Sequence, residues 1–233
     1  KTSPKSRWFV QFPRRLRAEG APARQLAQNR GAIHHPMATD TFVTDVTFGP
    51  DVIVTTVTNS GATVEGWLQE IRSVLGDLVV GIDVEWRPSY GPSQNPVALL
   101  QLCVGRRCLI FQLLHADFVP QALSGFLADP NLRFVGVGVQ EDVERLSDDH
   151  SLEVANAVDL RGLAAEGMQM PELRQAGLQA VARTVMGANL QKPQRVRMGP
   201  WDAYCLSYDQ IKYACIDAFV SFEVGRKLLT GDL

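Results

Sequence analysis

The sequence predicts an α/β domain whose mixed sheet of about five strands is flanked by helices. Apolar and β-branched runs, each roughly four to eight residues long, recur from about residue 41 to residue 160. Three of these runs follow one another over residues 78–113 with short connections, which is typical of an antiparallel meander. Helical patterns separate the later runs, and from residue 163 the pattern is mostly helical.

The composition is that of a globular chain. Of its 233 residues, 45% are hydrophobic and 21% are charged, which is enough material for one core. No apolar run approaches the roughly 20 residues of a membrane-spanning helix, so we expect no membrane partner. The four cysteines include no C-x-x-C pair, which favours reduced, buried thiols. We therefore expect an intracellular protein of the nucleus or cytoplasm.

A basic leader precedes an acidic domain. Residues 1–36 hold eight bases against one acid, whereas the rest of the chain holds fifteen bases and twenty-four acids. The leader could be an organelle-targeting segment, a nucleic-acid-binding arm or upstream sequence that is not native. Met37 looks like a natural start. We expect residues 1–36 to be disordered, targeting or non-native and residues 37–233 to form one domain; a transit leader would place the protein in an organelle.

The first elements follow from spacing. Residues 41–58 are predicted to form a hairpin, because β-rich runs flank the turn at Gly49-Pro50. From Thr63 apolar residues recur three and four apart, which predicts an amphipathic helix of about a dozen residues. Residues 78–86 form a mostly apolar, β-branched run, which predicts a buried strand.

The middle of the chain supplies further strands. Residues 97–104 and 108–113 are predicted to complete the meander with the strand at 78–86. Residues 118–128 carry apolar side chains on one helical face, and residues 133–137 form the next predicted strand.

The last elements include two helices. Gly138 begins a helix, and a short strand around residues 154–160 follows it; a crossover helix of this kind favours parallel pairing. The final helix is predicted from about Ser207 to Leu229, with Ser207 as its N-cap and Asp209 in its first turn. This order of elements is what a ribonuclease H-like mixed sheet would produce.

Two carboxylates lie at the end of the predicted buried strand. Asp83 and Glu85 are two residues apart, and side chains alternate along a strand, so both point to one face. Desolvated like charges are costly unless cations or metal ions lie beside them. This pair is therefore the first candidate for a functional site.

Two further acids have unusual surroundings. Asp142 falls in the first turn of a helix that closely follows a strand. An alternative role for Asp142 is to complement the helix dipole, together with Glu141 and Glu144. Tyr213 and Asp217 are four residues apart, on one face of the final helix, among mostly apolar neighbours. A structural hydrogen bond between them also stays open.

Together these residues meet the requirements of one chemistry. Phosphodiester hydrolysis by two divalent metal ions needs a cluster of carboxylates, because hard cations prefer oxygen ligands. We expect Asp83 to bridge both ions, Glu85 and Asp217 to complete the shell of the ion that activates water, and Asp142 to serve the second ion. Tyr213 is expected to orient the nucleophilic water or the scissile phosphate.

Three ordered motifs resemble those of the DEDD exonuclease superfamily. They are Asp83-Val84-Glu85-Trp86, Gly136-Val137-Gly138-Val139-Gln140-Glu141-Asp142, and Trp201 with Leu206-Ser207, Gln210, Tyr213-Ala214 and Asp217-Ala218. The third motif resembles that of the DEDDy branch, because Tyr213 lies four residues before the last aspartate. The histidine branch would have His at the position where this chain has Lys212. Over about residues 40–229 the chain most resembles Werner-syndrome-type 3′–5′ exonucleases, in particular single-domain plant members.

The resemblance implies a ribonuclease H-like fold, two Mg²⁺ or Mn²⁺ ions, and removal of nucleotides from a 3′ end. It also implies that metal ions are bound by Asp83, Glu85, Asp142 and Asp217, and that Tyr213 positions the water. The second motif lacks the Asn and aromatic residue that many DEDD enzymes place before its Asp, a lack that the Werner-type group shares. Gly199-Pro200 stands where a Ser-Asp or similar pair often precedes the tryptophan, which bears on substrate contacts rather than on the metals.

Candidate substrate contacts lie near these motifs. Phosphate contacts are expected from four bases, Arg87, Lys192, Arg195 and Arg197, although the last three also fit a solvated loop. Trp86 and the pair Leu99-Leu100 could stack on or wedge against terminal bases. Core packing is the competing interpretation of the two leucines.

The main hypothesis is a metal-dependent 3′–5′ exonuclease that acts on DNA. The first alternative is an exoribonuclease that trims RNA, because discrimination of the sugar depends on one or two contacts to the 2′-OH. The second is an inactive scaffold that binds nucleic acid or protein. No helicase or nucleic-acid-binding module follows in the sequence. We therefore expect processivity or targeting to come from a homo-oligomer, a helicase or another protein partner.

Overall fold

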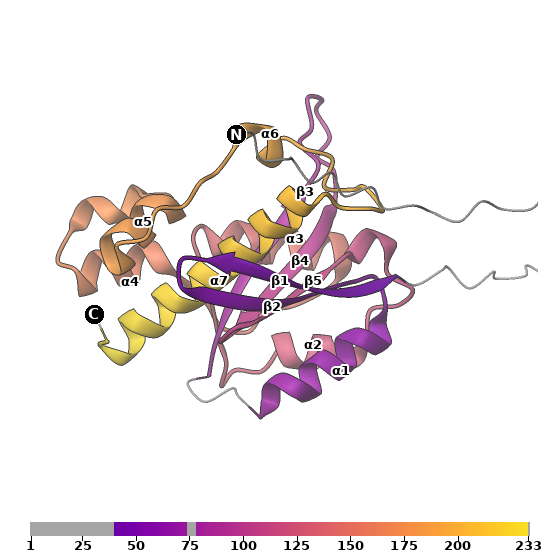
Figure 1. Cartoon of the computed structure of the whole chain (residues 1–233), viewed down its shortest axis with the longest axis horizontal. Coiled ribbons are helices and arrows are strands. Elements are labelled where there is room, and N and C mark those ends of the chain that lie inside the picture. The colour runs from indigo at the N-terminus through magenta and orange to yellow at the C-terminus, as the bar shows by residue number, and fades with distance from the viewer. Residues whose placement is uncertain (1–39, 74–77, 233) are drawn as a thin grey trace, which may run out of the picture. The chain divides into compact units, whose positions relative to one another are not determined.

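The computed structural model describes residues 40–73 and 78–232, and these belong to one compact unit (Figure 1). The predicted leader, residues 1–36, lies outside the described residues, so its assignment and the domain boundary at residue 37 stay predictions. No helix in the described part of the chain is long and apolar enough to cross a membrane. Of the four cysteines, Cys205 is exposed, and the other three are buried, as expected.

The described residues form a seven-stranded mixed sheet in the order β1-β2-β5-β4-β3-β6-β7. The strands are β1 (Thr41–Phe48), β2 (Asp51–Thr58), β3 (Val79–Trp86), β4 (Val97–Val104), β5 (Arg107–Phe111), β6 (Arg133–Gly136) and β7 (Ala157–Asp159). The predicted hairpin and the antiparallel meander β3-β4-β5 are confirmed, as is the parallel pairing of β6 with β7. The sheet exceeds the expected five strands because β2 also pairs with β5, in parallel, and so joins the hairpin to the meander.

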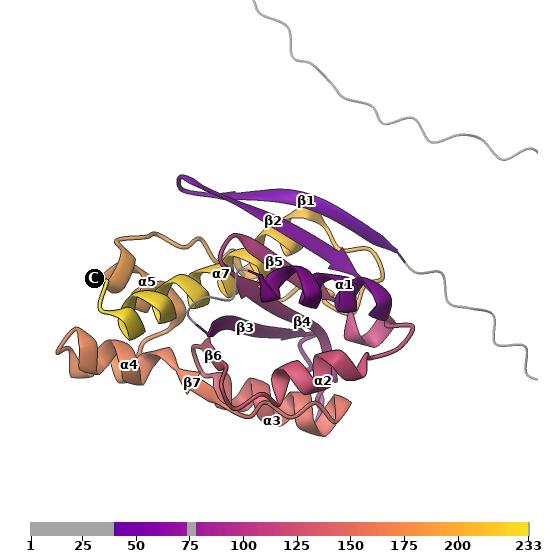
Figure 2. The same ribbon diagram turned by 90° about the horizontal axis from the view of Figure 1, so that it is seen from below.

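Helices cover both faces of this sheet. They are α1 (Gly61–Arg72), α2 (Gln121–Leu127), α3 (Val139–His150), α4 (Leu160–Gly167), α5 (Leu178–Met186), α6 (Gln194–Arg197) and α7 (Tyr208–Thr230), with short 3₁₀ turns at Leu113–His115 and Pro171–Gln175. Helix α7 crosses one face, with α4 and α5 beside it, whereas α1, α2 and α3 pack on the other (Figures 1 and 2). Alternate residues of β4 therefore enter different layers: Leu99 and Cys103 face α7, and Leu100 and Leu102 face the opposite helices.

Helix α7 begins where the sequence places its cap. The hydroxyl of Ser207 accepts a hydrogen bond from the backbone N–H of Gln210, and the Gln210 side chain accepts one from the backbone N–H of Ser207. This capping box satisfies backbone donors that the first helical turn leaves unpaired. The helix ends at Thr230 and is capped by Gly231, whose φ of 76° is a left-handed conformation that glycine adopts at little cost. The predicted final helix is confirmed within one or two residues.

A glycine brings α7 into contact with β3. A Cβ atom at Gly81 would lie 2.1 Å from the backbone oxygen of Ala218 and 2.7 Å from the backbone nitrogen of Phe222. Only glycine therefore allows the helix to approach the strand this closely. Gly81 lies two residues before Asp83, and Ala218 directly follows Asp217. The close approach of helix and strand at Gly81 therefore sets the two acids beside each other.

Candidate active site

The structure brings the predicted acids together from three elements. Asp83 and Glu85 lie on β3, Asp142 in the first turn of α3, and Asp217 on α7. The charges of Asp217 and Asp142 both act on Asp83, and those of Asp83, Asp217 and Asp142 act on Glu85. The convergence that the sequence predicts for these acids is thus present in the fold.

Burial and mutual repulsion hold these acids toward their neutral forms. Burial, followed by the charges of Asp217 and Asp142, raises the pKa of Asp83 well above its usual value. Burial, followed by the charge of Asp83, has the same effect on the pKa of Glu85. Burial also raises the pKa of Asp217, which is only 4% exposed. Carboxylates in this state gain from any cation that enters among them.

Asp142 is not an ordinary first-turn acid. It is 9% exposed, and burial followed by the charge of Glu141 raises its pKa to about 7, although Arg145 acts in the opposite direction. A carboxylate that mainly complemented a helix dipole at the surface would have a lowered pKa. Gly138, with a φ of 74°, is the N-cap of α3 two residues after β6 ends, and so places Asp142 close to the C-terminal end of that strand.

Lys192 supplies positive charge at this site. Its Nζ lies 2.5 Å from Oδ2 of Asp217 and 5.3 Å from the centre of the Tyr213 ring. The segment that carries Lys192 is held to α5, because Nε2 of Gln179 donates a hydrogen bond to the backbone oxygen of Leu190 at 2.8 Å. The sequence suggested Lys192 as a phosphate contact; its ion pair with an acid 25 positions away depends on the path of the loop, which spacing does not show.

Tyr213 lies among the acids and is partly buried. Burial, together with the charges of Asp217, Glu85 and Asp83, raises the pKa of its hydroxyl. The ring packs 5.8 Å from that of Trp201, a fully buried residue. The phenol is therefore protonated at neutral pH and acts as a hydrogen-bonding group rather than as a base.

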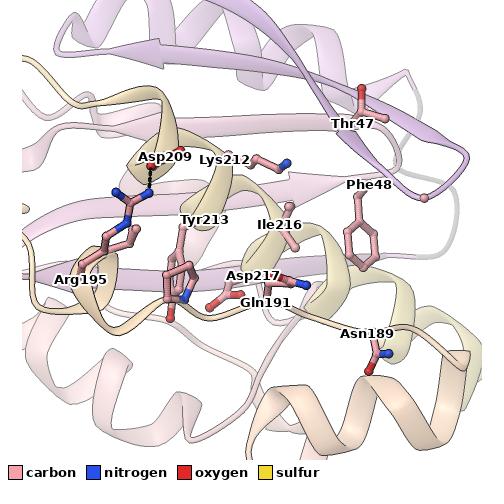
Figure 3. Close-up of a pocket in the computed structure, with 13 residues that line it drawn as sticks. Thr47, Phe48, Asn189, Gln191, Arg195, Asp209, Lys212, Tyr213, Ile216 and Asp217 are labelled. Carbon is pink, nitrogen blue, oxygen red and sulfur yellow. Dashed lines mark hydrogen bonds and ion pairs between the residues drawn. The ribbon is translucent and has the colours of Figure 1, made fainter.

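A cavity of about 410 Å³ is lined by Tyr213 and Asp217 (Figure 3). Its other walls are the end of β1 with Gly49, residues 189–196 and the first three turns of α7. Arg195 and Lys212 bring positive charge to its wall, and Arg195 pairs with Asp209 at 2.7 Å. Arg197 is exposed and close enough to lower the pKa of Asp217.

The other predicted substrate contacts differ in their surroundings. The guanidinium of Arg145 lies 3.8 Å above the Trp86 ring, so one face of this ring is already covered. Arg87 makes two hydrogen bonds to Asp202, at 3.0 and 3.1 Å, and stays half exposed. Leu99 has no exposed surface and packs in the core, so the structure contradicts its predicted contact with a terminal base.

Sequence reasoning missed two residues at this site. Arg145, three positions after Asp142, covers Trp86 and holds the loop before β4 through hydrogen bonds to Gln94 and Asn95. Gln101 pairs in register with Asp83 and is fully buried. A polar residue within an otherwise apolar strand was the signal that could have found Gln101.

The donor set of this edge fits hard divalent cations. Mg²⁺ and Mn²⁺ prefer carboxylate oxygens as ligands. Four carboxyl groups with raised pKa values meet at this site. Among residues 40–73 and 78–232, no three His, Cys, Asp or Glu side chains are already placed to hold a metal ion.

Comparison with known proteins decides the family. A family model for 3′–5′ exonucleases matches residues 55–230, which include all four acids and Tyr213. The chain belongs to the 3′–5′ exonuclease family. The resemblance to 3′–5′ exonucleases drawn from the three motifs is thereby confirmed. The mouse bifunctional 3′–5′ exonuclease/ATP-dependent helicase WRN is 32% identical over 152 residues, covering 64% of this chain and 11% of that protein.

Other relatives agree with this family. A 3′–5′ exonuclease of Arabidopsis thaliana is 33% identical over 160 residues, which cover 67% of this chain and 54% of that protein. The chain thus spans about half the length of the Arabidopsis relative and less of WRN. The crystal structure of the Aedes aegypti Nibbler EXO domain matches 76% of this chain and 88% of that one, with a TM-score of 0.63 and 18% identity, which shows the shared fold.

The metal-free protein is expected to lose stability as the pH rises from about 4 to 7. The native state holds the proton of Asp142 up to a pKa of about 7, whereas an unfolded chain releases it near 3.8. The stabilisation by this proton is complete below the lower value and is lost as the pH passes the upper one. The difference corresponds to roughly 4 kcal/mol.

Urea unfolding in EDTA at several pH values measures this decline. The variant Asp142→Asn cannot titrate at this position, so its stability should fall less steeply over the same range. An equally steep decline in the variant would show that Asp142 does not titrate in this window.

Proposed function

We propose that the chain is a 3′–5′ exonuclease that hydrolyses phosphodiester bonds at the 3′ ends of DNA with the help of divalent cations. The observation that carries this proposal is the convergence of four acids with raised pKa values, from β3, α3 and α7, at one edge of the sheet. Membership of the 3′–5′ exonuclease family supports the same reaction.

Two Mg²⁺ or Mn²⁺ ions, when bound, would neutralise the charge that develops on the attacking and leaving oxygens of the phosphodiester. Asp83, Glu85, Asp142 and Asp217 would hold these ions, with Asp83, flanked by the other acids, as the proposed shared ligand. Burial and, after it, mutual repulsion raise the pKa values of Asp83 and Glu85, and cations among the acids would relieve this repulsion.

Tyr213 and the neighbouring bases complete the proposed site. The protonated hydroxyl of Tyr213 can donate a hydrogen bond to the scissile phosphate or accept one from the attacking water. Lys192 lies between Asp217 and the Tyr213 ring, from where its ammonium group can move onto a phosphate oxygen of the substrate. Arg197 is exposed nearby and can contact the next phosphate.

A 5′-labelled DNA oligonucleotide tests the proposal. With Mg²⁺ or Mn²⁺ the protein should produce a ladder of products shortened from the 3′ end, and EDTA should abolish it. The variant Tyr213→Phe is expected to reduce turnover by about a hundredfold, because only the hydroxyl that orients water or phosphate is lost.

The matched control is Tyr208→Phe, which removes an exposed hydroxyl from the first turn of the same helix and should leave turnover unchanged. Parental turnover by Tyr213→Phe would remove Tyr213 from the proposed site. No ladder under any condition would contradict the exonuclease assignment itself.

RNA is the alternative substrate. A competition between DNA and RNA oligonucleotides of one sequence distinguishes the two, because only the 2′-OH differs. Faster shortening of the RNA would change the proposed substrate and leave the proposed chemistry intact. A homo-oligomer or a helicase partner, and an intracellular location, are further proposals from the sequence.

A further inference from the structure

A glutamine lies beside Asp83 in the apolar layer beneath α7. Gln101 on β4 pairs in register with Asp83 on β3 and with Ile110 on β5. Residues directly opposite each other in an antiparallel pair point to the same face of the sheet. The neighbours of Gln101 along this face of β4 are Leu99 and Cys103, both of which pack in the core under α7. Asp83 is therefore the charged side chain directly across the strand from Gln101.

The amide of Gln101 is buried without a partner. Its exposed fraction is 0%, and within the described residues neither Nε2 nor Oε1 makes a hydrogen bond. A buried polar group without a partner is costly, and an apolar side chain of the same length would avoid this cost. Packing alone thus gives no reason for an amide here, which indicates that the amide acts in another state of the site.

Asp83 lacks an orienting side chain of its own. Lys192 pairs with Asp217, whereas no ion pair joins Asp83 to a base in the described part of the chain. The ionised form of Asp83 is favoured by the charge of Lys192 and, after it, by a backbone hydrogen bond at Val84. Carboxylates that bind metal ions are commonly held in place by hydrogen bonds from neighbouring groups.

We propose that Gln101 is a positioning residue for Asp83, and that its Nε2 donates a hydrogen bond to the Asp83 carboxylate when the site holds divalent cations. Cross-strand Cβ atoms lie about 4.5–5.5 Å apart. A glutamine side chain spans that gap, so rotation about its last torsions is enough to bring the amide to a carboxylate oxygen. The hydrogen bond fixes the orientation of Asp83. The inference rests on the proposed function, because it needs cations at this site.

Calorimetric titration of Mn²⁺ into metal-free protein tests this role without relying on activity. The variant Gln101→Met keeps the length of the side chain and removes both polar atoms. We expect it to melt at a higher temperature than the parent in EDTA and to bind Mn²⁺ about 10- to 100-fold more weakly. Gln101→Leu provides a second apolar shape with the same expected result, should the methionine variant fail to fold.

The matched control is Ile110→Leu, which alters packing on the other side of Gln101 and should leave Mn²⁺ affinity within about twofold of the parent. Parental Mn²⁺ affinity in a folded Gln101 variant would overturn the positioning role and leave the proposed function standing. Absence of Mn²⁺ binding by the parent itself would overturn both.

Discussion

Replacing Asp83 with asparagine is expected to reduce 3′-end shortening by roughly a thousandfold or more. Asp83 stands among the other acids and is the proposed ligand of both cations, so the amide removes one charge and one oxygen ligand at the centre of the cluster. Cations at such sites contribute several kcal/mol of transition-state stabilisation, and about 4 kcal/mol corresponds to a thousandfold change in rate.

The same variant should melt at a higher temperature than the parent in the absence of metal. Burial followed by the charges of Asp217 and Asp142 raises the pKa of Asp83, so ionising this residue costs stability in the metal-free protein. An amide has no such cost, and functional residues of this kind often reduce stability. The rise shows that lost activity does not come from unfolding.

Asp45→Asn is the matched control, because Asp45 lies exposed on the edge strand β1 and the change in chemistry is the same. Its turnover and melting temperature should both match the parent. Turnover by Asp83→Asn within tenfold of the parent would remove Asp83 from the centre of the proposed mechanism.

Replacing Gly81 with valine is expected to destabilise the protein by more than about 4 kcal/mol. The new Cβ would lie 2.1 Å from the backbone oxygen of Ala218 and 2.7 Å from the backbone nitrogen of Phe222, and neither atom belongs to a flexible side chain. Helix α7 would have to move off the sheet, which uncovers the core layer beneath it. Asp217 and Tyr213 would move with the helix, so activity should be lost as well.

Guanidinium unfolding of the two proteins measures this change. Gly66→Ala is the control: Gly66 lies exposed within α1, and a Cβ there meets no atom within 4 Å. Alanine at this position should stabilise the protein by about 0.5–1 kcal/mol, because glycine within a helix costs conformational entropy. Unfolding of Gly81→Val at the parental guanidinium concentration would contradict the close contact of α7 with β3.

Much of the fold is local in origin and could be predicted. The apolar run of β3, the short connections of the meander and the cap at Ser207 are each written within a few residues, and each appears in the structure. The parallel pairing of β2 with β5 was missed, since it joins segments about 50 residues apart. Spacing within a segment does not record which distant strand becomes its neighbour.

The site shows the same division. The four acids and Tyr213 could be found because carboxylates are rare in apolar segments, and Asp83 and Glu85 share a face through strand alternation alone. The ion pair of Lys192 with Asp217 and the stacking of Arg145 on Trp86 depend on the paths of loops. Loops have no periodic sequence pattern from which such contacts could be predicted. Leu99 illustrates the opposite error: it pairs in register with Glu85, yet its side chain is fully buried in the core.

The central claim is that the acids of β3, α3 and α7 bind divalent cations together at one edge of the sheet. A crystal soaked in Mn²⁺ with a nucleoside monophosphate tests this most directly, because the anomalous signal of manganese locates each ion. The account predicts Mn²⁺ ligated by Asp83 together with Glu85, Asp142 and Asp217, with the phosphate of the nucleotide beside them. Manganese bound elsewhere, or a site without Asp83 as a ligand, would contradict it.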